Sequence, residues 1–209
     1  MRVFLMLCLK QKFERLTDIR NKSDLIDLAH SLGSVYIQKD DKHGHGIVTL
    51  RYDTSIPKYG FSNTALFPHT DRSNMKFPPD IVILWCEKNA TFGGDSLIFD
   101  ADKHLMPIIH EVNFFADFSS ENDRKTIRAP FYSMEKDMFR FRNDAFISLS
   151  DESTRQFERV KSIIQHHTRR IKLREKECLV LDNHKVFHGR DEFEGDRVMH
   201  RVLIYKDSE

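Results

Sequence analysis

Apolar residues along this chain gather in short runs, and most of these runs have the length and composition of β-strands. The most continuous run is residues 80–86 (DIVILWC), where apolar side chains follow one another without a polar break. A run of this kind is typical of a strand that is buried on both faces of its sheet. Further strands are expected at residues 35–37, 46–52, 96–99, 177–183 and 197–205, with short strands and loops between 114 and 149.

Two segments have helical spacing instead. Residues 22–32 (KSDLIDLAHSL) place their apolar side chains on one face of a helix, and Ser23 is the expected N-cap. The clearest helix is expected at residues 151–170, where an apolar stripe follows a serine or aspartate cap. Residues 101–112 have a weaker helical pattern because a proline interrupts them.

The order of these elements indicates a mainly β protein with two or three flanking helices. Strands and helices do not alternate regularly, which disfavours a doubly wound parallel sheet. A sandwich or barrel with helices on one outer side fits the order better. The chain has 209 residues, an ordinary size for one domain, and neither a repeat nor a low-complexity tract divides it. We therefore expect a single domain over residues 1–209.

Composition and charge narrow the possible functions. Lys plus Arg number 33 and Asp plus Glu number 32, which gives a net charge of +1 with neutral histidines. This balance disfavours an electrostatic nucleic-acid binder, because such proteins need an excess of cations to displace counterions from phosphates. Hydrophobic residues make up 40% of the chain, enough for an ordinary core, and the 17 Phe are expected to fill that core.

The three cysteines, Cys8, Cys86 and Cys178, are widely spaced and odd in number. They provide neither a disulfide framework nor a zinc-ribbon spacing, so a reducing compartment, the cytoplasm, is the simplest expectation. The apolar run at residues 1–9 is short for a signal peptide and far too short to span a bilayer. We expect a buried strand or the start of a helix there, and no membrane association.

The first candidate for chemistry is the segment His69-Thr-Asp71. In an extended segment, residues two apart point the same way, so one imidazole and one carboxylate can face one metal ion. The spacing alone is weak evidence, because about one such pair is expected by chance among these many histidines and aspartates. Taken alone, this segment is best interpreted as a solvated loop.

A second histidine can complete a set of metal ligands. His188 follows a strong apolar strand and precedes a glycine and an arginine. Two histidines and one carboxylate on one face of an octahedral metal leave three positions open, as in non-haem Fe(II) oxygenases. His184 is the rival ligand, and we favour His188 because His184 follows the strand directly and lacks the Gly-Arg turn. Either histidine, taken alone, is better explained as one held by ordinary hydrogen bonds.

Two arginines on the last expected strand suggest anions inside the fold. Arg197 and Arg201 share one strand face with Met199, whereas the opposite face is mostly apolar and suits packing against a helix. Two guanidinium groups inside a barrel are costly unless they meet anions, which a dicarboxylate cosubstrate and an anionic substrate would supply. The alternative is an edge strand with both arginines in solvent. Arg140 and Arg142 could line a substrate mouth, although a solvated strand face more often explains such alternation.

Four motifs, taken in order, give the chain a resemblance to a known family. They are His69-Thr-Asp71, Phe92-Gly-Gly-Asp-Ser96, Asp182-Asn-His-Lys-Val-Phe-His188-Gly-Arg190 and Arg197-Val-Met-His-Arg201. In this order the chain resembles the Fe(II)/2-oxoglutarate-dependent dioxygenases, and among them the taurine dioxygenase and clavaminate synthase-like branch. The resemblance covers about residues 62–205, and the combination is far more specific than any single motif.

The resemblance implies a fold, a metal and a cosubstrate. The family fold is a double-stranded β-helix, a jelly-roll or cupin-like core, and its members use Fe(II), 2-oxoglutarate and O2. His69, Asp71 and His188 match the iron ligands of the family and would be catalytic. Ser96 and Arg197 match residues that hold 2-oxoglutarate.

The resemblance also implies a class of substrate. Arg201 matches an arginine that grips the acidic group of the substrate in relatives, and its alternative role is a second contact to 2-oxoglutarate. The expected function is hydroxylation of a C–H bond in a small amino-acid-like or other anionic molecule of a biosynthetic pathway. The expected partner is that small molecule, with no nucleic acid and no membrane, and the oligomeric state stays open.

Some alternatives and departures accompany this resemblance. The same fold could catalyse desaturation or cyclisation, or the chain could be a non-catalytic β-barrel that binds a small molecule. Relatives in this branch are commonly longer, so N-terminal elements or a lid are expected to be missing. Asp71 argues against halogenation, because halogenating relatives carry a small residue at that position.

Overall fold

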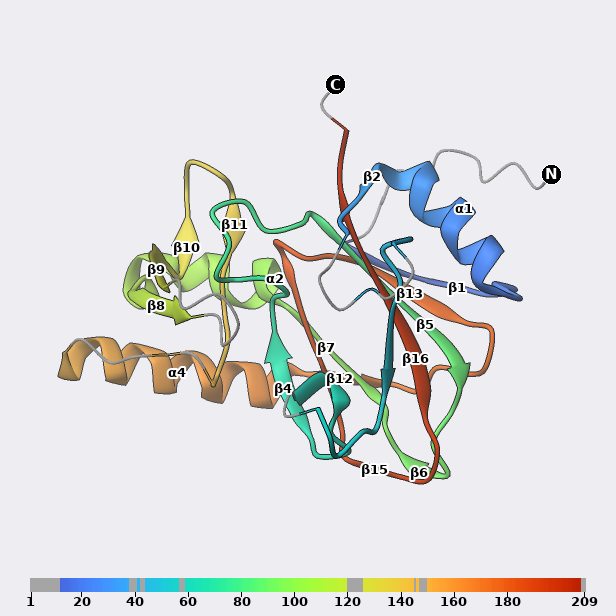
Figure 1. Ribbon diagram of the computed structural model, residues 1–209. Coiled ribbons are helices and arrows are strands. Elements are labelled where there is room, and N and C mark those ends of the chain that lie inside the picture. Colours follow the sequence, from blue (N-terminus) through green and yellow to red (C-terminus); the bar gives the residue numbers. More distant parts are fainter. Residues whose placement is uncertain are drawn as a thin grey trace.

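The computed structural model describes residues 12–37, 41, 44–56, 59–119, 126–144, 146 and 150–207. Two antiparallel sheets form the body of the molecule, and helices lie on its outside (Figure 1). This is the mainly β fold with flanking helices that the sequence predicts. The apolar run at residues 1–9, expected to be a strand or a helix start, lies outside the described residues.

The larger sheet contains six strands. Its order is β1 (Phe13–Leu16), β13 (Cys178–Asp182), β5 (Ile81–Lys88), β16 (Val198–Tyr205) and β2 (Ser34–Val35), and β3 (Val48–Arg51) also pairs with β16. The alternative of an edge strand is therefore wrong, because β16 lies between β5 on one side and β2 and β3 on the other.

The smaller sheet contains four strands, and short two-stranded ribbons flank the body. Its order is β12 (Arg169–Ile171), β7 (Ser96–Asp100), β14 (Val186–Arg190) and β4 (Leu66–His69). The ribbons are β6 (Phe92–Gly93) with β15 (Phe193–Glu194), β8 (Phe115–Ser119) with β9 (Thr126–Pro130), and β10 (Tyr132–Ser133) with β11 (Met138–Phe139).

The chain passes back and forth between the two sheets. From β4 to β5 to β7, and again from β13 to β14 to β16, each strand lies in the other sheet from the one before it. Strands that are neighbours in a sheet are therefore far apart in the sequence, as β1 and β13 illustrate. This winding is that of a jelly roll, in agreement with the expected double-stranded β-helix.

Strand β5 is buried on both faces, as its continuous apolar sequence predicts. Alternate residues, with Trp85 among them, join a core beneath helix α1 (Lys22–Leu32) on the outer face of the larger sheet. The intervening residues, with Leu84 among them, pack between the two sheets against Ile98 of β7. Figure 1 shows α1, in blue, over this sheet and α4, in orange, on the other side of the molecule.

Phenylalanine fills the third core, beneath helix α4 (Asp151–His167). Phe157 of α4 stacks on Phe141 with ring centroids 5.4 Å apart, and Phe141 stacks on Phe187 of β14 at 5.5 Å. The expected aromatic core is therefore confirmed for this part of the molecule. This aromatic core packs against one side of the smaller sheet. Two of the candidate metal ligands lie on strands of that sheet.

The helices agree with the sequence pattern except at their ends. Asn21, not Ser23, caps α1, because the Asn21 side chain accepts a hydrogen bond from the Asp24 backbone. Helix α4 starts after Ser150 in a capping box but ends at His167, because the next residues pair with β7 as strand β12. The interrupted helix near Pro107 is divided into α2 (Ala101–Leu105), η2 (Met106–Ile108) and α3 (Ile109–Val112).

Several short elements escape prediction from sequence. Strand β4 and the short helix η1 (Tyr59–Phe61) lie where the sequence pattern predicts neither a strand nor a helix. Strand β2 contains only the first residue of the strand expected at 35–37. Within the described ranges, no helix combines the length and the apolar character needed to cross a bilayer.

Candidate metal centre

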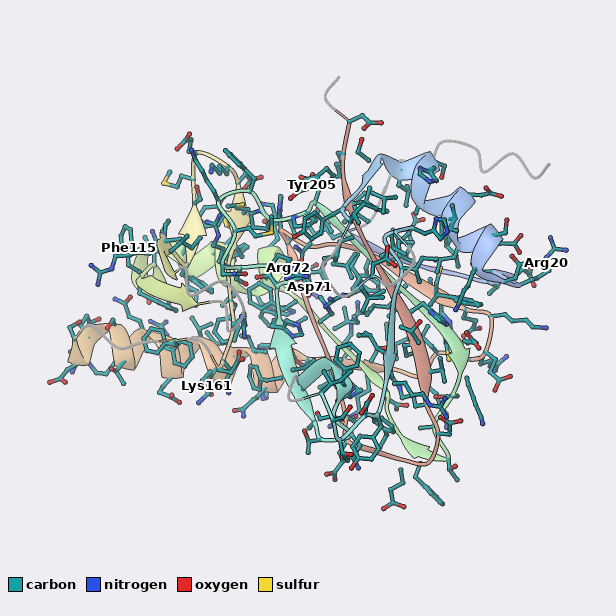
Figure 2. The ribbon with its side chains drawn as sticks, in the orientation of Figure 1. Arg20, Asp71, Arg72, Phe115, Lys161 and Tyr205 are labelled. Carbon is teal, nitrogen blue, oxygen red and sulfur yellow. The ribbon has the colours of Figure 1, made fainter. Side chains whose placement is uncertain are left out.

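His69 and His188 meet because strands β4 and β14 are neighbours. The two histidines stand opposite each other in the register of this antiparallel pair, and their ring centroids are 4.7 Å apart. Asp71 follows two residues after the end of β4, and Figure 2 shows it near the middle of the molecule. One ligand atom from each of these three side chains lies within 4.8 Å of the other two. The structure thus brings the three expected ligands together.

The ring orientations suit metal binding. His69 Nδ1 lies 3.0 Å from the carbonyl oxygen of Phe67, so it donates its proton there and leaves Nε2 for a metal. Burial, together with the neighbouring His188, lowers the pKa of His69 to about 4. His69 is therefore neutral at pH 7, which is the form that binds metals. His188 directs Nε2 towards Asp71, at 3.4 Å from Oδ2.

The carboxylate of Asp71 is ionised although it is buried. Burial alone would raise the pKa of Asp71, but the charge of Arg201, together with the neighbouring His188, outweighs it and holds the pKa far below its usual range. Asp71 Oδ2 accepts no hydrogen bond from the described residues. A buried anionic oxygen beside two imidazoles is the donor set of an Fe(II) site with open positions. The residues present therefore fit the expected metal.

His184, the rival ligand, lies outside this cluster. Its Nε2 is 3.2 Å from the carbonyl oxygen of Pro78, and its Nδ1 is 3.6 Å from a carboxylate oxygen of Asp80. The sequence-based preference for His188 therefore agrees with the geometry.

Gly189, directly after His188, allows the two histidine strands to approach closely. A Cβ atom on this residue would lie 2.3 Å from the carbonyl oxygen of Leu66, a backbone atom that cannot move aside cheaply. The glycine beside His188 is thus required by the pairing of β14 with β4.

Arg197 is a buried cation close to the end of the smaller sheet. Only 6% of its surface is exposed, and among the described residues no carboxylate lies within ion-pair distance of it. Burial lowers the pKa of Arg197 to about 10, so the guanidinium keeps its charge at pH 7. The turn at Gly94 makes room for it, because a Cβ there would lie 3.0 Å from Arg197 Nε. Such a cation is expensive to bury unless an anion joins it.

A second buried arginine, Arg190, lies beside the first. Its guanidinium carbon is 5.0 Å from the ring centroid of Phe193, and that of Arg197 is 5.5 Å from the same ring. Burial and the charge of Arg197 lower the pKa of Arg190 to about 10. Ser96, which is 2% exposed, stands opposite Arg190 in the pairing of β7 with β14. We call these four residues, Ser96, Arg190, Phe193 and Arg197, the arginine corner.

Arg201 faces the metal centre. It lies on β16 and donates a 2.7 Å hydrogen bond from Nη1 to Asp71 Oδ1. The predicted assignment of side chains to the two faces of this strand is confirmed. Val202 packs beneath α1, whereas Met199, on the opposite face, packs between the sheets. Arg201 thus joins the larger sheet to a ligand that follows a strand of the smaller sheet.

Sequence comparison identifies the family to which these features belong. A family model described as "Taurine catabolism dioxygenase TauD, TfdA family" matches residues 6–105 and 113–203. The chain belongs to the TauD/TfdA family. This is the family of non-haem Fe(II)/2-oxoglutarate dioxygenases that the four motifs indicate, and the chain carries its His-Asp-His triad.

Solved structures of other non-haem iron oxygenases share the fold. Asparagine oxygenase in complex with Fe(II), 2S,3S-3-hydroxyasparagine and succinate matches with a TM-score of 0.76 and 16% identity, over 87% of this chain and 63% of that one. The non-haem iron oxygenase OrfP in complex with Fe and alpha-ketoglutaric acid has the same TM-score and identity, over 97% of this chain and 77% of OrfP. A search of curated protein sequences found no match.

This TauD/TfdA chain is shorter than the asparagine oxygenases that it resembles. It spans less than two thirds of their length, 63% and 62% of the two chains.

The two arginines considered for the substrate mouth have different surroundings. Arg140 is buried, not solvated, and its Nη2 donates 3.0 Å hydrogen bonds to the carbonyl oxygens of Met75 and Lys76. Arg142 instead forms a 2.6 Å ion pair with Asp144. The charge of Arg142 also lowers the pKa of His69, although burial and the neighbouring His188 contribute more. This ion pair therefore lies near the metal centre.

Sequence reasoning gave no role to Arg190 in this TauD/TfdA chain. The signal was present, since Arg190 closes the motif that holds His188. What the sequence does not reveal is that this residue packs against the same aromatic ring as Arg197.

Proposed function

We propose that this protein is an Fe(II)/2-oxoglutarate-dependent oxygenase that hydroxylates a C–H bond of a small, anionic, amino-acid-like molecule. The observation that carries the proposal is that the triad and the buried Arg190 and Arg197 lie on or directly beside neighbouring strands. The proposal covers one domain over residues 1–209 and a cytoplasmic location, in line with the buried free thiols of Cys86 and Cys178.

The triad would hold the iron from one side. His69 Nε2, His188 Nε2 and a carboxylate oxygen of Asp71 are the ligand atoms, and they leave the opposite side for small molecules. Bound iron would supply the activation of O2 that couples oxidation of 2-oxoglutarate to oxidation of the substrate. The protein itself contributes the neutral imidazole of His69, the ionised carboxylate of Asp71 and a site in which Asp71 and His188 are buried.

The arginine corner would bind the distal carboxylate of 2-oxoglutarate. Arg197 is the buried cation that needs an anion, and a guanidinium matches a carboxylate with two parallel hydrogen bonds. The Ser96 hydroxyl is placed on β7 to add one neutral hydrogen bond. The charge of Arg190 strengthens the attraction for an anion in this corner.

Arg201 would bind the anionic group of the substrate. It pairs with Asp71 Oδ1, so its guanidinium lies at the metal centre. A guanidinium presents its N–H donors in a planar fork, which suits it to bind an anionic group beside the metal. Related structures support an amino acid as the substrate, since they contain hydroxyasparagine in asparagine oxygenase and (3S)-hydroxy-L-Arg in OrfP.

The test is substrate-stimulated formation of succinate. Free amino acids and small sulfonates are screened with Fe(II), 2-oxoglutarate and O2, and mass spectrometry follows the substrate for a gain of one oxygen. Loss of two hydrogens instead would indicate desaturation or cyclisation. Absence of iron-dependent succinate with every compound would contradict the enzymatic proposal and favour a binding protein.

The role of Arg201 has a separate test. Arg201→Ala should abolish turnover of anionic hits, whereas Arg170→Ala, which removes an exposed arginine paired with Asp191, should leave turnover unchanged. Hits confined to neutral molecules, with Arg201→Ala turning them over normally, would contradict the anionic substrate.

A further inference from the structure

Asn183 has a side chain whose hydrogen-bonding groups are all used, and most of them reach the Asp71 peptide. Its Oδ1 accepts a 2.8 Å hydrogen bond from the Asp71 N–H, and its Nδ2 donates to the Asp71 carbonyl oxygen at 3.0 Å. Nδ2 also donates to the carbonyl oxygen of Pro79 at 2.8 Å. The residue is fully buried, so water does not compete for these bonds.

Asp71 needs such an anchor more than the two histidines do. His69 and His188 are held by the pairing of β4 with β14, which fixes their backbones through the sheet. Asp71 lies beyond the end of β4, in a turn where the following residue, Arg72, has a positive φ of 57°. The two bonds from Asn183 to the N–H and C=O of Asp71 therefore replace the ladder bonds that a strand would give.

Asn183 is itself held in place by the larger sheet. Asn183 directly follows strand β13 of the larger sheet, and its own N–H donates a 2.8 Å hydrogen bond to the Asp80 carbonyl oxygen at the start of β5. Asn183 thus connects the carboxylate ligand to the larger sheet, whereas the histidine ligands belong to the smaller one. The separation between the two kinds of ligand depends on this connection.

We propose that Asn183 is a positioning residue that holds Asp71 where its carboxylate can bind the metal together with His69 and His188. The proposal rests on the proposed function of the triad as a metal centre. It assigns to Asn183 a task beyond satisfying buried carbonyl groups. Outer groups that orient metal ligands typically change metal affinity about 10- to 100-fold when they are removed.

The experiment measures metal affinity rather than turnover. Co(II) is titrated into the full-length metal-free protein, and its visible absorption reports both the dissociation constant and the coordination of the metal. Asn183→Ala should weaken Co(II) binding about 10- to 100-fold and change the absorption spectrum. The matched control is Asn89→Ala, since Asn89 also donates a 3.0 Å hydrogen bond from Nδ2 to a backbone carbonyl, that of Leu173. This control should bind Co(II) like the wild type.

A second variant keeps the test decisive if Asn183→Ala does not fold. Asn183→Asp keeps the shape and the acceptor but replaces both donated bonds by repulsion between the new carboxylate and two carbonyl oxygens. An added negative charge near a cation site would raise metal affinity through electrostatics. Weaker Co(II) binding by folded Asn183→Asp would therefore indicate displaced ligand geometry.

The outcomes separate this proposal from the function on which it rests. Wild-type Co(II) affinity and spectrum in both Asn183 variants, with only a lower melting temperature, would show a purely structural residue and overturn the proposal. If the wild type binds Co(II) tightly but releases no succinate, the positioning role stands and the oxygenase function fails. If the wild type binds no Co(II), both proposals fail together.

Discussion

At the scale of single residues, the assignment of the metal centre depends on whether His188 or His184 is the third metal ligand beside His69 and Asp71. His188→Ala should remove a ligand and abolish iron-dependent succinate formation. His184→Ala should leave iron binding unchanged, because the His184 ring lies against Pro78 and Asp80, outside the triad. Iron content per chain and single-turnover succinate yield provide the measurement. Full iron occupancy in His188→Ala would contradict the assignment of the triad.

Arg197 permits a similar test for the cosubstrate. Arg197→Ala should raise the KM for 2-oxoglutarate about 10- to 150-fold, because hydrogen bonds to charged groups contribute about 1.5–3 kcal/mol. Ser96→Ala should raise it only a few-fold, since one neutral bond contributes about 0.5–1.5 kcal/mol. The KM for the substrate should move far less in both variants. Equal changes in the two KM values would make the arginine structural, and Arg159→Ala, at an exposed ion pair with Glu111, is the control.

The sequence predicts those residues whose neighbours are local or whose motif is distinctive. His69 and Asp71 are two residues apart, and the expectation that both face one metal site is met, although Asp71 lies in a turn beyond β4. The sequence could not predict the role of Asn183, because its partners at Asp71 and Pro79 are about a hundred positions away. It likewise could not predict that Arg201 pairs with Asp71, since that contact joins the two sheets.

At the scale of elements, strong apolar patterns were sufficient to predict helices and strands, and weak patterns were not. The apolar run of β5 and the stripe of α4 predict these elements because burial of their own side chains stabilises them. Strands β4 and β12 were not predicted, since one contains Pro68 and the other two exposed arginines. They exist because β14 and β7 offer them backbone partners, which a local pattern does not reveal.

The aromatic core beneath α4 leads to a prediction about stability. Phe157 is 5% exposed and stacks on Phe141, and Phe141 stacks on Phe187 next to the ligand His188. Phe157→Ala should lower the free energy of unfolding by about 3–5 kcal/mol, as expected for a large cavity. Phe92→Ala, at a residue that is 69% exposed, should change it by less than about 0.5 kcal/mol. Equal effects in urea titrations would contradict this packing.

At the scale of the whole molecule, the metal centre lies where the two sheets are joined. The histidine ligands come from the smaller sheet, and Asn183 and Arg201 connect Asp71 to the larger one. The overall winding could be predicted only through the family resemblance. Composition and periodicity gave a sandwich or barrel, because no local pattern specifies which distant strands pair.

The position of β16 has a consequence for synthesis on the ribosome. This strand lies between β5 and β3 in the larger sheet, yet all its partners among the described strands are made before it. The edge of β5 that pairs with β16 therefore stays without its partner until residues 198–205 leave the exit tunnel. Chains arrested before residue 198 should be cut rapidly by protease and bound by chaperones. Chains carried past residue 205 by a long linker should resist cleavage, and equal resistance in both would mean that the sheet forms without its central strand.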